Sequence, residues 1–513
     1  MTALADPTIY GKEPGRGPLR AGGQPGTTVL TEANRPSTRS RAVQRQALGL
    51  GIVRDLEAGA ERVRERAGTY LPQNPAEDGE NYAVRLERSV FHNFFRRTAE
   101  GLTGLVFRVD PWMNEDVPAK IVEHWEAIDG AGQHGDVFCR AAFFDAFIAG
   151  HAAIFVEYPK VEGKQSLAQE RTRRPYWLLI HKDNIVSWRT AIQEGEEVLT
   201  QLVLEERTMV PLGEFGEQEQ IRYRIFRQDA GVVVFALVEE NSAGKLDLID
   251  TGDYPTQARI PIAEIATSGR VGLFESIPPL LDLAYLNIAH YQQWSDYATS
   301  IHKTCVPILF GAGVSQPTNQ AGQGVVVGAN SSIWSSDPAA TLAYTSHNGE
   351  ALDACKRALD ELKSDIGVLG LSMLTPQKRM AETAEAKRID KATGDSSLAV
   401  AARGLQDAVE MALQFHANYL GIPEGGQVEI NRDFEGVAME SSVMIAYGQL
   451  VRDAGFPARM VLEMLQRGGR LPPNVDLDEL ELEMAAEMAA QATINAAVTP
   501  KAGEPEDEEP DTE

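Results

Sequence analysis

Residue types that can catalyse reactions occur in this chain without the spacings that catalytic motifs need. Three Gly-Lys pairs could belong to a P-loop, but none is followed by the Ser or Thr whose hydroxyl reaches a magnesium ion. These pairs are Gly11-Lys12, Gly163-Lys164 and Gly244-Lys245. The chain also contains no HExxH zinc motif and no GxSxG nucleophile elbow. A glycine-rich segment at 322–328 has one residue too many before its third glycine for a dinucleotide loop, so we interpret it as a turn.

The remaining polar clusters have plainer explanations. The nine histidines do not fall at metal-ligand spacings. An acidic run at 476–483 suits a solvated helix start better than a metal site, and the aromatic residues at 285–297 suit helix packing or a subunit contact. We therefore expect no enzyme, no metal and no cofactor. The alternative that stays open is a soluble enzyme whose site is assembled from scattered residues.

Charge narrows the classes of protein further. The chain has 513 residues, with 74 Asp and Glu against 48 Lys and Arg, which gives a formal net charge of −26. Such a surface repels phosphate backbones and anionic lipids, so a general nucleic-acid coat or a membrane-surface protein is excluded. The three cysteines (Cys139, Cys305, Cys355) are far apart, which favours a reducing compartment over a disulfide framework. We expect no membrane span, and two to four cores at this length.

The elements that would position any site indicate an α+β fold. Residues 1–45 are expected to form a flexible basic arm, 46–160 a helical part and 161–276 a β-rich part. In the helical part, helices are predicted over 80–108, 118–129 and 137–148, followed by a strand at 153–158. In the β-rich part, short apolar runs predict strands at 177–180, 185–188, 198–204, 221–226 and 232–238.

Two long helices enclose a small β insertion. Apolar residues at spacings of three and four predict helices over 277–304 and 350–371, the first of them about 42 Å long. The insertion at 305–349 is rich in Gly, Ser and Thr and holds three strand candidates, so it must lie at the far end of an antiparallel helix pair. A third helical seam within 386–420 precedes two short helices, near 439–454 and 457–467, and an acidic tail at 496–513.

Several segments, taken in order, resemble a known family. They are Tyr82-Ala-Val-Arg-Leu-Glu-Arg-Ser-Val-Phe-His-Asn93, Arg97-Thr-Ala-Glu-Gly-Leu-Thr-Gly-Leu-Val-Phe107, Gly150-His-Ala-Ala-Ile-Phe-Val-Glu-Tyr-Pro159, Ile277-Pro-Pro-Leu-Leu-Asp-Leu-Ala-Tyr-Leu-Asn-Ile-Ala-His-Tyr291, Pro307-Ile-Leu-Phe-Gly311 and Thr383-Ala-Glu-Ala386. Together they resemble the portal (head–tail connector) proteins of tailed bacteriophages, in a branch catalogued as a domain of unknown function. The resemblance covers about residues 70–480.

The resemblance implies a mostly helical portal fold that assembles as a ring, usually of twelve subunits, at one capsid vertex of the virion. Double-stranded DNA would be packaged and ejected through it. Partners would be the terminase large subunit, a head–tail adaptor, and the major capsid and scaffold proteins, with synthesis in the host cytoplasm. The chain regions would be the wing (161–276), stem helices (277–304 and 350–371), clip (305–349), tunnel loop (372–385), wing helix (386–420) and crown (421–495).

The same resemblance implies candidate site residues. The DNA-channel candidates are Lys378, Arg379, Glu382, Glu385, Lys387 and Arg388, and an exposed loop of mixed charge explains them equally well. The candidates for stem contacts between subunits are Leu281, Ile288, Tyr291, Leu359 and Leu362, and those for the clip are Phe310, Val326 and Trp334. A channel that is acidic overall would repel the duplex and let it slide. Another ring-forming head–tail structural protein is the nearer alternative, although such adaptors are usually much smaller.

Overall fold

The computed structural model describes most of the chain between residues 35 and 434. The described residues are 35–75, 77–159, 173–229, 231–241, 245–268, 272–305, 308–312, 332–335, 339, 343–345, 350–372, 396–432 and 434, with isolated residues 459, 477, 480 and 482. The chain divides into two compact units, one of residues 1–107 and 111–432 and the other of residues 108–110 and 433–513. All helices and strands whose bounds follow lie in the first unit.

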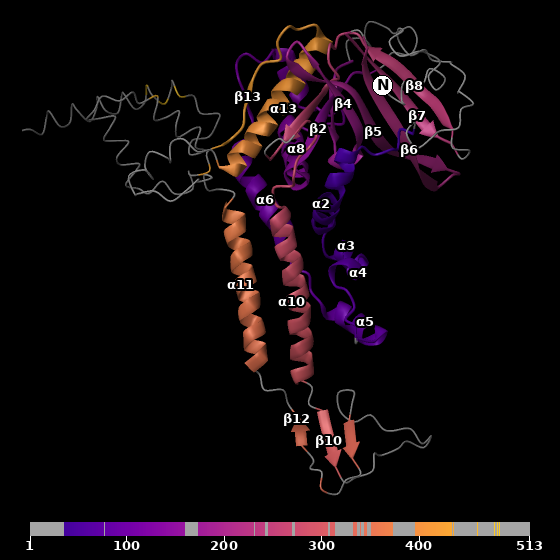
Figure 1. Ribbon diagram of the computed structural model, residues 1–513. Coiled ribbons are helices and arrows are strands. Elements are labelled where there is room, and N and C mark those ends of the chain that lie inside the picture. The colour runs from indigo at the N-terminus through magenta and orange to yellow at the C-terminus, as the bar shows by residue number, and fades with distance from the viewer. Residues whose placement is uncertain are drawn as a thin grey trace, which may run out of the picture. The chain divides into compact units, whose positions relative to one another are not determined.

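Two antiparallel sheets form the β-rich part of the first unit (Figure 1). The larger sheet is a meander in the order β4-β5-β6-β7-β8. Its strands are β4 (Ile185–Gln193), β5 (Glu196–Leu212), β6 (Gly216–Asp229), β7 (Val232–Glu240) and β8 (Leu246–Tyr254). The smaller sheet has the order β3-β2-β9, built from β3 (Tyr176–Ile180), β2 (His151–Glu157) and β9 (Ile262–Ala266). A 3-10 turn, η3 (Lys182–Asn184), joins β3 to β4.

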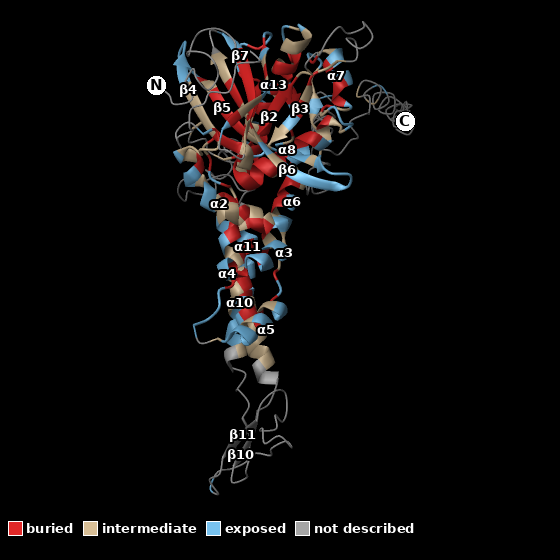
Figure 2. Cartoon of the chain, turned by 90° about the vertical axis from the view of Figure 1, so that its right-hand side faces the viewer, coloured by how far each residue is buried: buried red, intermediate tan, exposed pale blue. Residues whose placement is uncertain are grey.

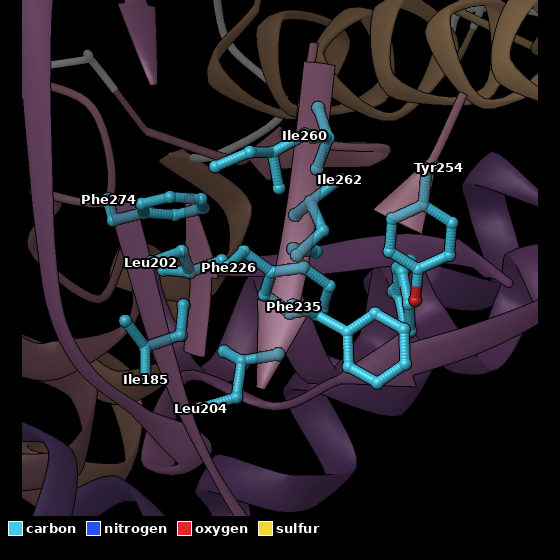
Figure 3. Close-up of a cluster of buried hydrophobic side chains, with 12 residues drawn as sticks. Ile185, Leu202, Leu204, Phe226, Phe235, Tyr254, Ile260, Ile262 and Phe274 are labelled. Atoms are coloured by element: carbon cyan, nitrogen blue, oxygen red, sulfur yellow. The ribbon is translucent and has the colours of Figure 1, made fainter. Parts of the chain in front are cut away.

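The two sheets share one apolar core. Phe155 and Ile262 of the smaller sheet pack in one cluster with Leu202, Phe226 and Phe235 of the larger sheet. Figure 3 shows Ile262 beside the larger-sheet residues of this cluster. Every residue of β2 is buried, so both faces of that strand are covered. A second apolar cluster lies on the larger sheet around Val203, Ile225 and Ala236. The burial of large aliphatic and aromatic side chains on both clusters is the main source of stability here.

Helices pack against the smaller sheet. They are α8 (Gly135–Ala149) and α13 (Ser397–Leu420), which contact both β2 and β9. The Ser396 side chain accepts a hydrogen bond from the backbone N–H of Ala399 and so caps α13 at its start, while Gly421 ends the helix at φ +69°, a left-handed conformation that favours glycine. Within α13, Gly404 lies so close to the carbonyl of Ala266 that a Cβ would clash with it.

The N-terminal helices are short and tied together by ion pairs. They are α2 (Arg41–Ala58), α3 (Ala60–Glu65), α4 (Ala67–Tyr70), α5 (Gly79–Arg88), α6 (Phe94–Val106) and α7 (Ala119–Trp125). The buried carboxylate of Asp55 accepts hydrogen bonds from Arg62 Nε at 3.1 Å, Arg66 Nη1 at 2.5 Å and the Tyr70 hydroxyl at 2.5 Å. Burial, followed by the bond to Asp55, raises the pKa of Tyr70. One acidic side chain therefore fixes α2, α3 and α4 against one another.

The two residues of strand β1 (Trp112–Met113) pair with β13 (Val428–Glu429).

The long helices α10 (Leu281–Cys305) and α11 (Glu350–Ser372) run side by side (Figure 1). They are antiparallel, because Gly370 near the end of α11 lies against Thr98 of α6, while the Asn287 side chain near the start of α10 accepts a hydrogen bond from Phe95 of the same helix α6. Between them the chain forms β10 (Ile308–Ala312), β11 (Ser332–Ser335) and β12 (Ala343–Thr345), in the order β11-β10-β12. Residues 306–307 alone separate α10 from β10, and residues 346–349 separate β12 from α11. Connectivity therefore holds the small sheet at one end of the helix pair.

The structure departs from the sequence-based expectations at several places. Helix α2 begins at Arg41, inside the segment 1–45 expected to be a flexible arm, because Ser40 caps it and Val43 and Leu50 are buried. The single helix expected over 80–108 is two helices, α5 and α6, since Asn93 caps a new start by accepting from the backbone N–H of Arg96. Strands β8 and β9 were not predicted, and β5 and β6 extend well beyond the predicted runs. The short helices expected at 439–454 and 457–467, the tunnel loop and the acidic tail lie outside the described residues, apart from isolated positions.

Candidate functional site

The helix pair α10–α11 is the candidate functional element, and polar bonds attach it to the N-terminal helices. The Asn287 side chain donates to the carbonyl of His92 at 2.8 Å and accepts from the backbone N–H of Phe95 at 3.0 Å. Eight residues further along α10, the Ser295 hydroxyl lies 2.7 Å from the Ser89 hydroxyl. The Gln292 side chain donates to the carbonyl of Tyr70 at 2.9 Å. One side of α10 is therefore fixed along much of its length by residues 70–95.

Helix α11 has two buried aliphatic side chains on one side and exposed charged side chains on the other. Leu359 and Ile366, seven residues apart, are buried, as expected for a helix that packs along a partner through one seam. Val368 is 65% exposed. The exposed charged side chains have mixed signs: Asp353, Lys356, Arg357, Asp360, Glu361, Lys363 and Asp365. Lys356 and Arg357 are the only adjacent cations on the described part of α11, and acidic residues lie on either side of them.

A third side of α10 carries exposed residues. Asp282, Tyr285, Gln293 and Asp296 recur at helical spacing and are exposed. Beside the start of the helix, Ile277 is 65% and Leu48 of α2 is 74% exposed. We name the surface of Leu48, Ile277 and Tyr285 the stem patch. Apolar side chains left exposed next to a long helix are typical of a protein contact.

Aromatic rings fill the space between α10 and the start of α6. His290 is completely buried, and neither of its ring nitrogens has a hydrogen-bond partner among the described residues. It packs against Phe94, His92 and Trp294, with ring centroids 5.0, 5.7 and 6.3 Å away. Burial, with the nearby His92 and Lys363, lowers the pKa of His290 to about 4, so the ring is neutral at pH 7. It therefore serves packing.

A buried polar joint connects the sheets to the beginning of α10. The Lys182 ammonium donates to the carbonyls of Ala149 at 2.9 Å and Ser276 at 3.0 Å, and burial lowers its pKa to about 8. The Ser276 hydroxyl lies 2.7 Å from His151 Nδ1. A Ser–His pair can act as a nucleophile and base, but Ser276 is 5% and His151 1% exposed, which leaves a substrate no access to either. The joint holds the five residues before α10 in place.

An ion-pair network supports this joint from α2. The Arg54 guanidinium donates through Nη1 to Asp145 at 2.6 Å and through Nε to Asp183 at 2.8 Å. His181 Nδ1 lies 2.9 Å from the same Asp145 carboxylate, and this hydrogen bond raises the pKa of His181. Although burial opposes it, the bonds from His181 and Arg54 lower the pKa of Asp145. The network keeps α2, α8 and η3 together at the base of the helix pair.

A third buried histidine, His416, joins α13 to β3 and α7. The Trp177 indole N–H donates to His416 Nδ1 at 3.2 Å, so the ring proton of His416 must be on Nε2. That proton points at His124 Nδ1, 2.9 Å away. Burial, followed by the charges of His124 and Arg174, lowers the pKa of His416 to about 3. The hydrogen-bond chain therefore requires a neutral His416.

The residues predicted from the sequence fall into three groups. The channel candidates at 378–388 and the clip candidate Val326 lie outside the described residues. Phe310 is in β10 and Trp334 in β11, where the register pairs Gly311 with Trp334. Among the stem candidates, Leu281, Ile288 and Leu362 are half-buried, whereas Tyr291 and Leu359 are buried inside their own chain. The Tyr291 ring packs against the Phe91 ring, with the two centroids 5.5 Å apart. The role of each in subunit contacts or the channel stays a prediction.

One exposed feature was missed from the sequence. Strands β5 and β6 continue as a hairpin past their neighbours in the sheet, and the turn at Gly213–Phe215 joins them. The signal that could have found it is Gly213, which opens a three-residue turn between β-type runs, although Pro211 and the three glutamates of residues 207–221 hide the apolar alternation.

Comparisons with known proteins add a family of unknown function. A family model described as a domain of unknown function, DUF4055, matches residues 279–420, which span α10, the small sheet, α11 and α13. No curated protein matches the chain. Among the described residues, no helix has both the length and the apolar character needed to cross a membrane.

Two solved structures of gene transfer agent particles are similar to this chain. One, titled "Virion of native gene transfer agent (GTA) particle", has 13% identity and a TM-score of 0.32, covering 77% of this chain and 95% of that chain. The other, titled "Neck of empty GTA particle computed with C6 symmetry", has 14% identity and a TM-score of 0.33, covering 79% of this chain and 97% of that chain. At these TM-scores the similarity carries no argument about function.

Proposed function

We propose that this chain is the repeating subunit of a portal, a ring through which double-stranded DNA enters and leaves a phage-like capsid at one vertex. The observation that carries the proposal is the antiparallel pair α10–α11 with the three-stranded sheet inserted between its helices. A helix of 25 residues is about 37 Å long. A pair of such helices, anchored at one end by Asn287 and the Ser276 joint, holds a small module well away from the two large sheets.

The exposed side of α10 supports ring formation. A ring needs two different surfaces on each subunit that meet head to tail. Helix α10 is covered on two sides by its own chain, and the stem patch adds three exposed apolar side chains beside the third. We propose that the stem patch, flanked by the half-buried Leu281 and Ile288, meets the neighbouring subunit.

Charge supports passage of DNA without tight binding. The net charge of −26 is repeated in every subunit, so the ring as a whole repels phosphate. A wall without a deep binding site lets the duplex move. We propose that Lys378, Arg379, Lys387 and Arg388, offset by Glu382 and Glu385, touch the DNA backbone transiently where the channel is narrowest.

Partners follow from the two ends of such a ring. We propose twelve subunits, a small sheet β10–β12 that docks the terminase large subunit during packaging and a head–tail adaptor afterwards, and a rim in contact with the major capsid and scaffold proteins. In this proposal the protein functions in the virion and acts without catalysis.

Measuring the mass of the purified full-length chain tests the proposal. The chain has a mass of 56.0 kDa. Mass photometry over increasing concentration is expected to show a closed species near twelve times that mass. Ile288→Asp should abolish that species, because a carboxylate would have to be buried between subunits. Ile192→Asp, which changes an 81% exposed side chain on β4, is the matched control and should assemble normally. A wild-type chain that stays at 56.0 kDa even when it is coexpressed with capsid and scaffold proteins would refute the proposal.

A further inference from the structure

Strands β5 and β6 form a hairpin arm that has no other strand beside it. β4 pairs with β5 only between residues 196 and 204, and β7 pairs with β6 only from Arg222 onward. Beyond these points β5 and β6 pair with each other alone, from Arg207↔Ile221 to Leu212↔Gly216. We name residues 207–221 the arm. In Figure 2 the far end of β6 is coloured as exposed, away from the buried centre of the sheet.

The arm exposes large apolar side chains at its tip and on both faces. Phe215 at the turn is 91% exposed, Met209 is 60% and Leu212 is 59% exposed. Because side chains alternate along a strand, Met209 and Leu212 lie on opposite faces. A two-stranded ribbon is only marginally stable in water without a covering surface. An arm of this kind is therefore expected to be covered by another molecule.

Charge indicates what the covering surface must carry. Arg207 pairs with Glu205 at 2.7 Å and with Glu219 at 3.3 Å, so these charges are satisfied within the sheet. Glu214 and Glu217 are exposed, and no ion pair of either is found in the described part of the chain. The arm thus offers Phe215 between the carboxylates of Glu214 and Glu217, with Leu212 and Met209 further along β5. A complementary surface would offer apolar side chains between cations.

The same chain carries such a surface on α3, on α5 and just beyond the end of α5, away from its own arm. Val84 is 40% and Val90 is 46% exposed, and Arg88 lies between them in sequence. Arg64 reaches the same place, because its guanidinium is 3.5 Å from the carbonyl of Ser89. Across the described ranges, neither Arg64 nor Arg88 pairs with a carboxylate. We name Arg64, Val84, Arg88 and Val90 the receptor patch.

We infer that the arm of one subunit docks on the receptor patch of a second copy of this chain, Phe215 between Val84 and Val90, and Glu214 and Glu217 beside Arg64 and Arg88. The arm and the receptor patch are exposed in the same chain, so the contact must be between molecules. A chain with a net charge of −26 repels its copies over most of its surface. Arg64 and Arg88, which form no ion pair in the described part of the chain, therefore make the receptor patch complementary in charge to an acidic arm. Because the two surfaces differ, the contact is head to tail, the type that closes rings.

This inference rests on the proposed ring, and cross-linking can test the arm contact separately from ring formation. In a chain with Cys305 and Cys355 replaced by serine, Phe215→Cys together with Val90→Cys should give a ladder of covalent multimers with a short bismaleimide. The matched control combines Val90→Cys with Ile192→Cys. Ile192 is 81% exposed, and it lies on β4 opposite Glu197, at the end of β5 that is far from the arm. The control should stay monomeric on a denaturing gel.

Two sets of variants measure the contribution of the contact. Replacing both Phe215 and Leu212 by serine should raise the concentration needed for assembly about tenfold or more, since apolar anchors dominate interfaces. Glu217→Arg should also weaken assembly, and adding Arg88→Glu should restore it. Circular dichroism should be unchanged in all of them, because these side chains are exposed in the monomer.

The outcomes distinguish the two proposals. If the wild type forms rings and the Phe215–Val90 ladder is no stronger than the control, the arm inference is overturned and the ring stands; the arm then serves a different protein. If the ladder forms but imaging shows open filaments, the arm inference stands and the portal proposal falls. If the wild type forms no ring and the double-cysteine variant forms no ladder, both are overturned.

Discussion

Acid should destabilise this protein through His416, because its hydrogen bonds leave no place for a second proton. Nδ1 accepts from the Trp177 indole, and Nε2 already carries the proton shared with His124. Protonating Nδ1 would set two donors against each other in a site with no solvent exposure. The low pKa of about 3 reflects first the burial and then the charge of His124.

The size and sign of the effect follow from linkage. In the unfolded chain a histidine has a pKa near 6.5, so between that value and about 3 the unfolded state binds a proton that the folded state refuses. The stabilisation is fully present above pH 6.5 and is lost as the pH falls. At pH 5.5, one unit below the unfolded pKa, His416 should cost about 1 kcal/mol of unfolding free energy relative to pH 7.5. At pH 5.5 the chain is still above its isoelectric point near 4.8 and stays negatively charged.

Urea unfolding followed by circular dichroism at pH 7.5 and pH 5.5 measures this difference. His416→Gln keeps an acceptor and a donor but cannot titrate, so the variant should show a pH dependence smaller by about 1 kcal/mol than the wild type. Equal pH dependence in the wild type and the His416 variant would refute the reasoning.

Three further predictions follow from packing, ion pairing and the proposed channel. Gly404→Val should lower the melting temperature by an amount equivalent to about 1 to 3 kcal/mol, because a side chain there meets the backbone of β9, whereas Gly367→Ala on the open face of α11 should leave stability equal or higher. Asp55→Ala should cost about 3 kcal/mol in chemical unfolding, because three donors lose one buried acceptor; a change below about 1 kcal/mol would contradict the bonding described. Replacing both Lys378 and Arg379 by Ala should change packaging efficiency in a terminase assay while assembly continues, and unchanged packaging would exclude a role for them.

Local patterns in the sequence were enough to predict the long helices. The expected helix over 277–304 corresponds to α10 at Leu281–Cys305, and the one over 350–371 to α11 at Glu350–Ser372. The spacing of apolar residues and the proline or glycine that follows them indicate where each helix runs and where it ends, from neighbouring residues alone. Helix α10 starts four residues later than expected, because it begins after Pro278 and Pro279 and does not include them in its first turn.

Contacts between distant parts of the chain could not be predicted in the same way. The order β3-β2-β9 brings residues 176–180 and 262–266 to either side of β2, a pairing that no local pattern contains. The buried bonds of Asp55, Lys182 and His416 depend equally on the tertiary arrangement. The arm could not be predicted for a different reason: no core covers either of its faces, so its apolar residues do not alternate regularly with polar ones.

Imaging the purified full-length chain by electron microscopy tests the central claim most directly. The account predicts end-on class averages with rotational symmetry and an open centre, and side views in which a narrow stalk formed by the α10–α11 pairs joins a broad rim. Averages showing only single compact chains, or closed particles with no opening along the symmetry axis, would contradict it.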